Sequence, residues 1–233
     1  MSRVAFKHYL VTRFNVNVPF AGKGLNVSTN WLERRFDLFG TFCYPSVANQ
    51  SLSQFEWLAM VHPATPKKFI QKLTDYDNLS PVLVEDAQEA TVSRVVRERA
   101  DGRSDFLITS RLDNDDAINR NFIQTVQDQF KGQAFQFITL TDGCEFQRGS
   151  TRRLTDKHNA FVSLIEESSS PRTVYCCKHN ATSANGPVTC IRTAEPMWMI
   201  VIHDCNVSNR FVEGKAIPVD LVNEFGIASN LTP

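Results

Sequence analysis

The stretch DFLITSRLDNDD, Asp105 to Asp116, decides how the rest of the chain is interpreted. Its apolar part, 106–112, has the length and composition of a buried strand. The run that follows, Asp113-Asn114-Asp115-Asp116, places three carboxylates within four positions. Apolar residues then return at helical spacing over 118–130. The stretch therefore predicts a strand over 105–112, an acidic turn and a helix in succession.

The same alternation of short apolar runs and amphipathic segments precedes this stretch. We expect strands at 8–16, 55–61 and 81–84, and helices at 44–52, 67–73 and 90–99. Thr65-Pro66 favours a helix start, with Thr65 as the cap and proline in the first helical position. Alternation of strands and helices predicts an α/β fold, in which a mainly parallel central sheet is flanked by helices.

The second half of the chain has a looser pattern. It contains FQFITL (135–140), an apparent helix NAFVSLIEE (159–167), a strand TVYCC (173–177) and the apolar run MWMIVI (197–202). No repeat or low-complexity tract marks a linker. We therefore expect a single domain, 1–233, with a nucleotide-binding half (1–133) and a half that carries acceptor-binding loops (134–233).

Composition excludes several classes of protein. The 233 residues include 25 Lys plus Arg and 25 Asp plus Glu, so no net field would hold nucleic acid or an anionic membrane. No window reaches the roughly 20 apolar residues that a membrane span needs. The six cysteines contain no CxxC pair and are typical of free thiols in a reducing cytosol. These features predict a soluble cytoplasmic protein, either free or at the inner face of a membrane.

The position of the acidic run indicates its chemistry. In an open α/β sheet, ligands bind beyond the carboxyl ends of the strands, where the run begins. Asp113 and Asp115 would point the same way if the strand continued, and their oxygens suit Mg²⁺ or Mn²⁺. Such a cation would clamp two phosphates and neutralise a departing diphosphate. His203, at the end of another apolar run, could complete the coordination.

Three other interpretations stay open. Asp115 or Asp116 could cap the next helix, although one cap needs one aspartate and the run contains three. A phosphatase with Asp113 as nucleophile is a second possibility, but Ala117 stands where its Asp-x-Asp-x-Thr pattern has threonine. The third is a nucleotide-binding or glycan-binding module without turnover.

A set of stretches over nearly the whole chain carries a family resemblance. They are TRFNV (12–16), WLERRFDLF (31–39), YPSVANQ (44–50), FEWLAMV (55–61), TSRLDNDD (109–116), NAFVSLIE (159–166) and WMIVIHDCN (198–206). With them the chain resembles glycosyltransferases of the GT-A fold, and more closely the putative rhamnosyl transferases. TSRLDNDD is the most specific of the stretches.

The resemblance implies a role for several residues. Asp113 and Asp115 would form the Asp-x-Asp motif, with Asp115 on the metal and Asp113 on the metal or the ribose, and His203 would be the carboxy-terminal metal ligand. Thr12 and Arg13 would border the nucleobase and diphosphate. Arg111 is also placed in the donor site, and burial within an apolar strand would require it to pair with a neighbouring carboxylate. Where many relatives have an aspartate near the base, this chain has His62-Pro63.

The implied reaction moves a sugar, rhamnose among the candidates, from a nucleoside diphosphate to a hydroxyl of a glycan or a lipid-linked glycan. Inversion requires a carboxylate that removes the proton of the acceptor hydroxyl. Glu166 is the candidate, because it lies between the acidic run and His203 in the chain. The alternatives are Glu167, Asp142, Glu145 and Glu195.

Overall fold

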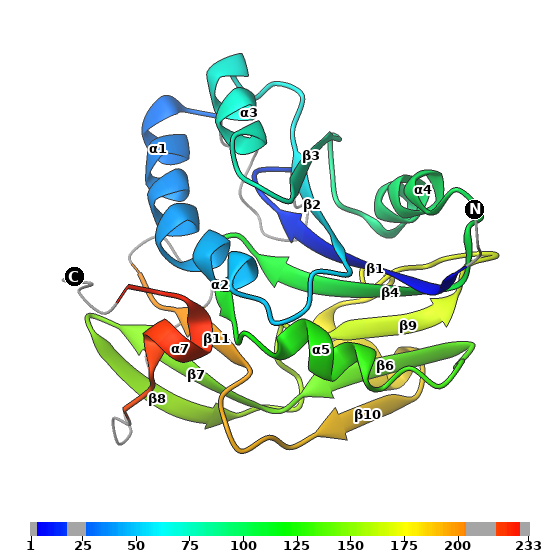
Figure 1. Cartoon of the computed structure of the whole chain (residues 1–233). Coiled ribbons are helices and arrows are strands. Elements are labelled where there is room, and N and C mark those ends of the chain that lie inside the picture. Colours follow the sequence, from blue (N-terminus) through cyan, green and yellow to red (C-terminus); the bar gives the residue numbers. More distant parts are fainter. Residues whose placement is uncertain (1–3, 18–26, 204–217, 229–233) are drawn as a thin grey trace.

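The computed structural model describes residues 4–17, 27–203 and 218–228 (Figure 1). Its central sheet is built from β1 (Val4–Arg13), β2 (Glu56–Val61), β3 (Leu79–Leu83), β4 (Ser104–Asp113), β6 (Phe135–Leu140), β9 (Ser163–Glu167) and β10 (Val188–Ile191). In the described part of the chain these seven strands lie in the order β10-β6-β9-β4-β1-β2-β3. Strands from both halves of the sequence therefore share one sheet.

The central sheet is mainly parallel. β1 runs parallel to β2 and to β4, and its last residue, Arg13, pairs with Met60 on one side and with Asp113 on the other. β2 and β3 are parallel, as are β6 and β10, whereas β9 is antiparallel to both of its neighbours, β4 and β6. The predicted α/β fold is confirmed, and the carboxyl ends of β1, β2 and β4 meet at one edge.

A smaller sheet continues from this edge. It contains β5 (Ala117–Ile118), β7 (Asp142–Gln147), β8 (Ser150–Thr155) and β11 (Trp198–Val201), in the order β5-β11-β7-β8 within the described residues. β4 ends at Asp113 and β5 begins at Ala117, so the acidic run is the turn that joins the two sheets. Helix α7 (Leu221–Phe225) packs on the smaller sheet through Phe225.

Helices pack on the central sheet, and successive residues of a strand point to opposite faces of it. The helices are α1 (Thr29–Leu38), a π-helical turn (Phe39–Cys43), α2 (Tyr44–Ala48), α3 (Lys67–Thr74), α4 (Glu89–Ala100), α5 (Phe122–Gln127) and α6 (Thr182–Asn185). Leu10 of β1 is buried in the core that α1, α3 and α5 share. Its neighbours Tyr9 and Val11 are buried in a second core with Val92 of α4. Successive residues of β1 thus face opposite layers of the molecule.

Two predictions for the second half are wrong. The segment 159–167 is not a helix, because Ser163–Glu167 form β9. Leu164 and Ile165 are buried on opposite faces of that strand, and a strand that is apolar on both faces has the same composition as a buried helix. The strand expected over 173–177 is a turn, in which Thr173 has a positive φ of 63°.

Boundaries in the first half also need correction. A helix begins at Thr29 and continues through the π-helical turn into α2, which ends at Ala48. For this part of the chain the prediction was a single helix at 44–52. The helix expected over 118–130 begins at Phe122, because β5 pairs with β11. Thr65 does not cap α3: its hydroxyl accepts a hydrogen bond from Asn15 at 2.8 Å, and Pro66 holds the cap position.

Two further expectations concern the whole chain. No helix within residues 4–17, 27–203 and 218–228 is long and apolar enough to cross a membrane. The cysteines that the structure describes are free thiols: Cys43, Cys144, Cys176, Cys177 and Cys190. Cys205 lies outside the described residues.

Candidate active site

The acidic run forms a tight turn at the carboxyl end of β4. The amide of Asp116 donates to the carbonyl of Asp113 at 3.3 Å, which closes the turn. Asn114 is buried, and its amide group donates to the carbonyl of Phe14, just beyond β1. The turn is therefore attached to the neighbouring parallel strand, and its three carboxylates leave it in different directions.

Asp113 lies between two arginines. Its Oδ1 accepts from Nη2 of Arg13 at 2.9 Å, and its Oδ2 accepts from Nη2 of Arg111 at 2.8 Å. Burial alone would raise the pKa of Asp113, but the two guanidinium groups lower it more, so its pKa lies well below the ordinary value. The predicted pairing of Arg111 with a neighbouring carboxylate is confirmed.

Asp115 binds two other side chains, those of Arg35 and His203. Its Oδ2 accepts from Nη1 of Arg35 at 2.7 Å and from Nε2 of His203 at 3.0 Å. Burial opposes ionisation of Asp115, but the hydrogen bond from His203 and the charge of Arg35 outweigh it and lower the pKa. The structure therefore brings together Asp115 and His203, which lie 88 positions apart in the sequence.

Asp116 has a different environment from the other two aspartates. Its side chain is 5% exposed, and its Oδ1 accepts from the backbone amide of Val201 in β11 at 3.0 Å. Burial, followed by the charges of Asp115 and Asp113, raises the pKa of Asp116 well above the ordinary value. The third carboxylate thus connects the turn to the smaller sheet and is turned away from solvent.

The aspartates differ in how well they suit a cation. Oδ2 of Asp115 and Nε2 of His203, both suitable ligand atoms, lie 3.0 Å apart. Both oxygens of Asp113 are already held by guanidinium groups. Among the residues that the structure describes, no three His, Cys, Asp or Glu side chains are arranged to hold a metal ion. By ligand type Asp115 and His203 suit a divalent cation, but the cation would have to replace the hydrogen bonds that Oδ2 of Asp115 accepts from Arg35 and His203. Asp113 would likewise have to release an arginine.

Sequence reasoning missed three residues of this site. Arg35 comes from α1, stacks on the Trp31 ring at 5.0 Å and bridges Asn114 to Asp115. Tyr175 donates to the carbonyl of Val11 and lies under the Arg13 guanidinium, which is 5.8 Å from the ring centre.

The third missed residue is His179, which follows Tyr175 on the same loop and hydrogen-bonds through Nδ1 to the carbonyl of His158 at 2.6 Å. None of the three residues is near the acidic run in the sequence, so no local pattern could have found them.

Thr12 lies within the core of the molecule. It is fully buried, and its hydroxyl accepts from the indole nitrogen of Trp57 at 2.9 Å. Its backbone lies between Ala59 of β2 and Leu112 of β4. The Thr12 side chain is therefore part of the core. Of the pair Thr12-Arg13, it is Arg13 that contacts the acidic turn.

Glu166 lies at the other end of β4. It pairs with Leu107, six residues before Asp113 along the strand. At a rise of roughly 3.3 Å per residue, this separates Glu166 from Asp113 by about 20 Å. Its carboxylate is 2% exposed and accepts from the backbone amides of Arg172 and Thr173, both at 2.8 Å. The prediction that Glu166 activates the acceptor does not fit this geometry.

The four alternatives to Glu166 have separate environments. Glu167 follows it toward the same distant end of β4. Asp142 accepts from Arg192, from the amide of Thr193 and from the hydroxyl of Thr141. Glu145 is buried within β7, and Glu195 is exposed on the loop before β11.

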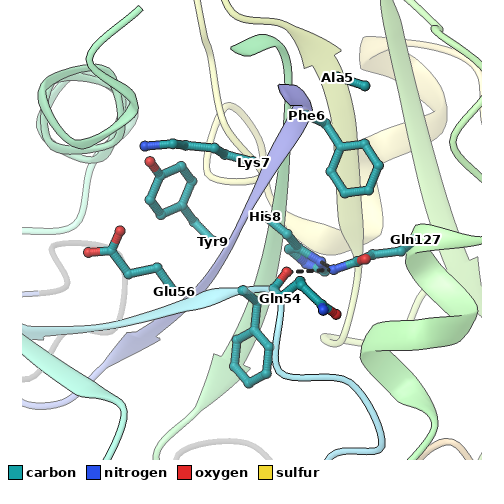
Figure 2. Close-up of a pocket in the computed structure, with 9 residues that line it drawn as sticks. Ala5, Phe6, Lys7, His8, Tyr9, Gln54, Glu56 and Gln127 are labelled. Atoms are coloured by element: carbon teal, nitrogen blue, oxygen red, sulfur yellow. Dashed lines mark hydrogen bonds between the residues drawn. The ribbon is translucent and has the colours of Figure 1, made fainter. Parts of the chain in front are cut away.

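A pocket of about 510 Å³ lies at the amino-terminal end of β1, away from the acidic turn (Figure 2). His8 is buried there, and burial lowers its pKa to about 3. The Gln127 amide nitrogen lies 2.9 Å from the carbonyl of Gln54 and 3.2 Å from Nδ1 of His8. Nε2 of His8 therefore carries the hydrogen and donates to Ser110 at 2.8 Å, so His8 does not activate this serine as a base.

A comparison with protein families assigns the chain to one of them. A model of the family described as "Putative rhamnosyl transferase" matches residues 25–215. The chain belongs to this family. The expected membership of this family is thereby confirmed. No curated protein sequence matches the chain.

Several solved structures resemble this putative rhamnosyl transferase family member in fold. S. aureus TarS 1-349 in complex with UDP-GlcNAc is 12% identical, with a TM-score of 0.48, and the match covers 90% of this chain and 62% of that one. This chain thus spans less than two thirds of that TarS fragment.

Two other solved structures give similar values. The putative nucleotide-diphospho-sugar transferase from Desulfovibrio desulfuricans G20 is 11% identical over 88% and 83% of the two chains, with a TM-score of 0.45. Rv0371C with manganese from Mycobacterium tuberculosis H37Rv is 11% identical over 87% and 94%, with a TM-score of 0.44. Because these TM-scores lie below 0.5, the assignment rests on the family match.

Proposed function

We propose that this chain transfers a sugar from a nucleoside diphosphate donor to a hydroxyl of a glycan or a lipid-linked glycan. The family description makes rhamnose the first sugar to test. We further propose that a divalent cation assists the reaction and that the anomeric centre is inverted.

The observation that carries this proposal is the convergence of three guanidinium groups on the acidic turn. Arg13, Arg35 and Arg111 come from β1, α1 and β4, and their side chains are 14%, 12% and 12% exposed. Each pairs with a carboxylate at 2.9 Å or less. A guanidinium group binds phosphate in the same bidentate manner as carboxylate. A diphosphate could therefore replace the carboxylates as partner of these arginines.

Asp115 and His203 would hold Mn²⁺ or Mg²⁺ at this turn, and Asp113 could join them after releasing one of its arginines. The bound ion would supply charge neutralisation on the departing diphosphate. Against the effect of burial, the hydrogen bond from His203 and the charge of Arg35 lower the pKa of Asp115, so its carboxylate is ionised at neutral pH. A cation that binds there would release Arg35 from this carboxylate. The contact with Asp115 positions Arg35 for the phosphate oxygens.

Inversion follows if the acceptor oxygen attacks the anomeric carbon from the face opposite the diphosphate. The bond between that carbon and the phosphate oxygen then breaks, and its electron pair leaves with the nucleoside diphosphate. The acceptor proton must pass to a base on the acceptor side.

Titration calorimetry with dTDP, UDP, GDP and CDP, each with and without Mn²⁺, tests the proposal. We expect one diphosphate to bind, and Mn²⁺ to tighten its binding. Incubation with the corresponding sugar nucleotide should then release the nucleoside diphosphate. Release of inorganic phosphate from a simple phosphoester would instead indicate a phosphatase, and binding without turnover would indicate a non-catalytic module.

A further inference from the structure

The loop after β9 runs along β4 and β1 and carries an imidazole, His179. His179 begins a short 3₁₀ turn, His179–Ala181, and is partly exposed. Arg111 and Asp113 on β4, and Asp156 on the loop before β9, all act on its pKa. The amide of Arg111 also donates to the carbonyl of Val162, so the chain just before β9 lies against this end of β4. Tyr175, four residues before His179 on the same loop, donates to the carbonyl of Val11 and lies against the Arg13 guanidinium, so this loop runs beside the proposed donor site.

A hydrogen bond to the backbone decides which nitrogen of His179 is basic. Its Nδ1 lies 2.6 Å from the carbonyl oxygen of His158. A carbonyl oxygen accepts and cannot donate, so Nδ1 carries the hydrogen. Nε2 of His179 is left with its lone pair, as a general base requires.

The charge state of His179 agrees with this role. Burial lowers the pKa of His179, the His158 carbonyl raises it, Arg111 lowers it, and Asp113 and Asp156 raise it. The net direction is downward from 6.5, so the ring is neutral at pH 7 and can accept a proton.

The first part of the loop that carries His179 is held by hydrogen bonds. Both oxygens of Glu166 accept from successive backbone amides, those of Arg172 and Thr173. Thr173 keeps a positive φ of 63°, which is costly for a β-branched residue and persists when the surroundings impose it. The amide of Val174 donates to Thr109 of β4 at 2.8 Å. The buried carboxylate thus positions the loop, although it lies far from the chemistry.

We propose that His179 is the general base of the transfer reaction; this assignment rests on the proposed function. Nε2 of His179 takes the proton of the acceptor hydroxyl as its oxygen forms a bond to the anomeric carbon. The bond from that carbon to the diphosphate breaks, and its electron pair leaves with the nucleoside diphosphate. His179 becomes an imidazolium ion and later releases the proton to solvent.

The test compares the wild-type chain with His179→Ala, using dTDP-rhamnose and UDP-rhamnose as donors, Mn²⁺ present and water as the acceptor. We expect nucleoside diphosphate release to fall by about 100-fold, the usual contribution of a general base. Donor affinity and its dependence on Mn²⁺, measured by calorimetry, should not change. Added imidazole should restore part of the release, because it can occupy the space that the partly exposed ring leaves.

Asn180→Ala is the matched control, because Asn180 is the next residue on the same turn and is exposed. It should release the diphosphate at the wild-type rate. Wild-type turnover in His179→Ala, or a loss that imidazole does not restore, would overturn the role of His179. Weaker Mn²⁺ binding in that variant would also overturn it, because the residue would then be a metal ligand. A wild-type chain that neither binds nor turns over any donor would instead overturn the proposed function.

Discussion

The two ends of β4 hold buried carboxylates in different ways. At the carboxyl end, Asp115 accepts hydrogen bonds from the side chains of Arg35 and His203. Near the amino end, Glu166 accepts from the backbone amides of Arg172 and Thr173. Side-chain donors can rotate toward a ligand, whereas backbone amides are fixed by the turn that contains them. The comparison teaches that burial and charge alone do not distinguish a ligand-binding carboxylate from a structural one.

Asp115→Ala should have the largest effect on activity. The change removes the carboxylate that Arg35 and His203 share, and with it the proposed metal ligand. Loss of one preorganised charge stabiliser costs about 3 kcal/mol in the transition state, or roughly 100-fold in rate. Metal-dependent release of the nucleoside diphosphate measures this effect, with Asp77→Ala, at an exposed acid, as control. Wild-type turnover in a folded Asp115→Ala protein would show that Asp115 is not a ligand-binding carboxylate, and the contrast with Glu166 would fail.

Glu166→Gln should affect stability more than activity. A glutamine can accept from one of the two backbone amides, but its NH₂ group then faces the other donor. We expect a loss of about 2 kcal/mol in the free energy of unfolding, because bonds to a buried charged group are among the stronger ones. Urea unfolding measures the loss, and turnover per folded molecule should change little.

The opposite pattern for Glu166→Gln would be equally informative. Full stability combined with loss of transfer would return Glu166 to the role of acceptor base. The contrast between the two ends of β4 would then fail.

The smallest expected effect is on how the free energy of unfolding depends on pH, through the ionisation of Asp113. The arginines lower its pKa in the folded protein, so its ionised form stabilises the fold above the unfolded pKa of about 3.8. This contribution is lost as the pH falls through the lower folded value. The stability advantage of the wild type over Asp113→Asn should therefore be full at pH 7 and smaller at pH 3 in urea unfolding. It should be modest, since the side chain is 27% exposed, and an advantage that grows in acid would contradict the arginine pairing.

The elements that the sequence predicted well have apolar residues arranged with a length or spacing typical of one type of secondary structure. Examples are the strand at 55–61 and the helix at 90–99, which correspond to β2 and α4. The failures occur where tertiary pairing overrides the local signal. β9 has the composition of a buried helix but lies between β4 and β6, and 173–177 forms a strained turn because Glu166 and Thr109 bind its amides.

The sequence by itself determined that an acidic run closes a buried strand, and it placed the run at the edge where parallel strands end. That inference needs only the length of the apolar run and the alternation of strands and helices along the chain. Tertiary structure alone decided which partners each aspartate has. Arg35 reaches the turn and Tyr175 reaches Arg13 from distant segments, and Glu166 lies far from the turn because β9 runs antiparallel to β4. Contacts between residues so far apart in the chain leave no periodic trace in a single sequence.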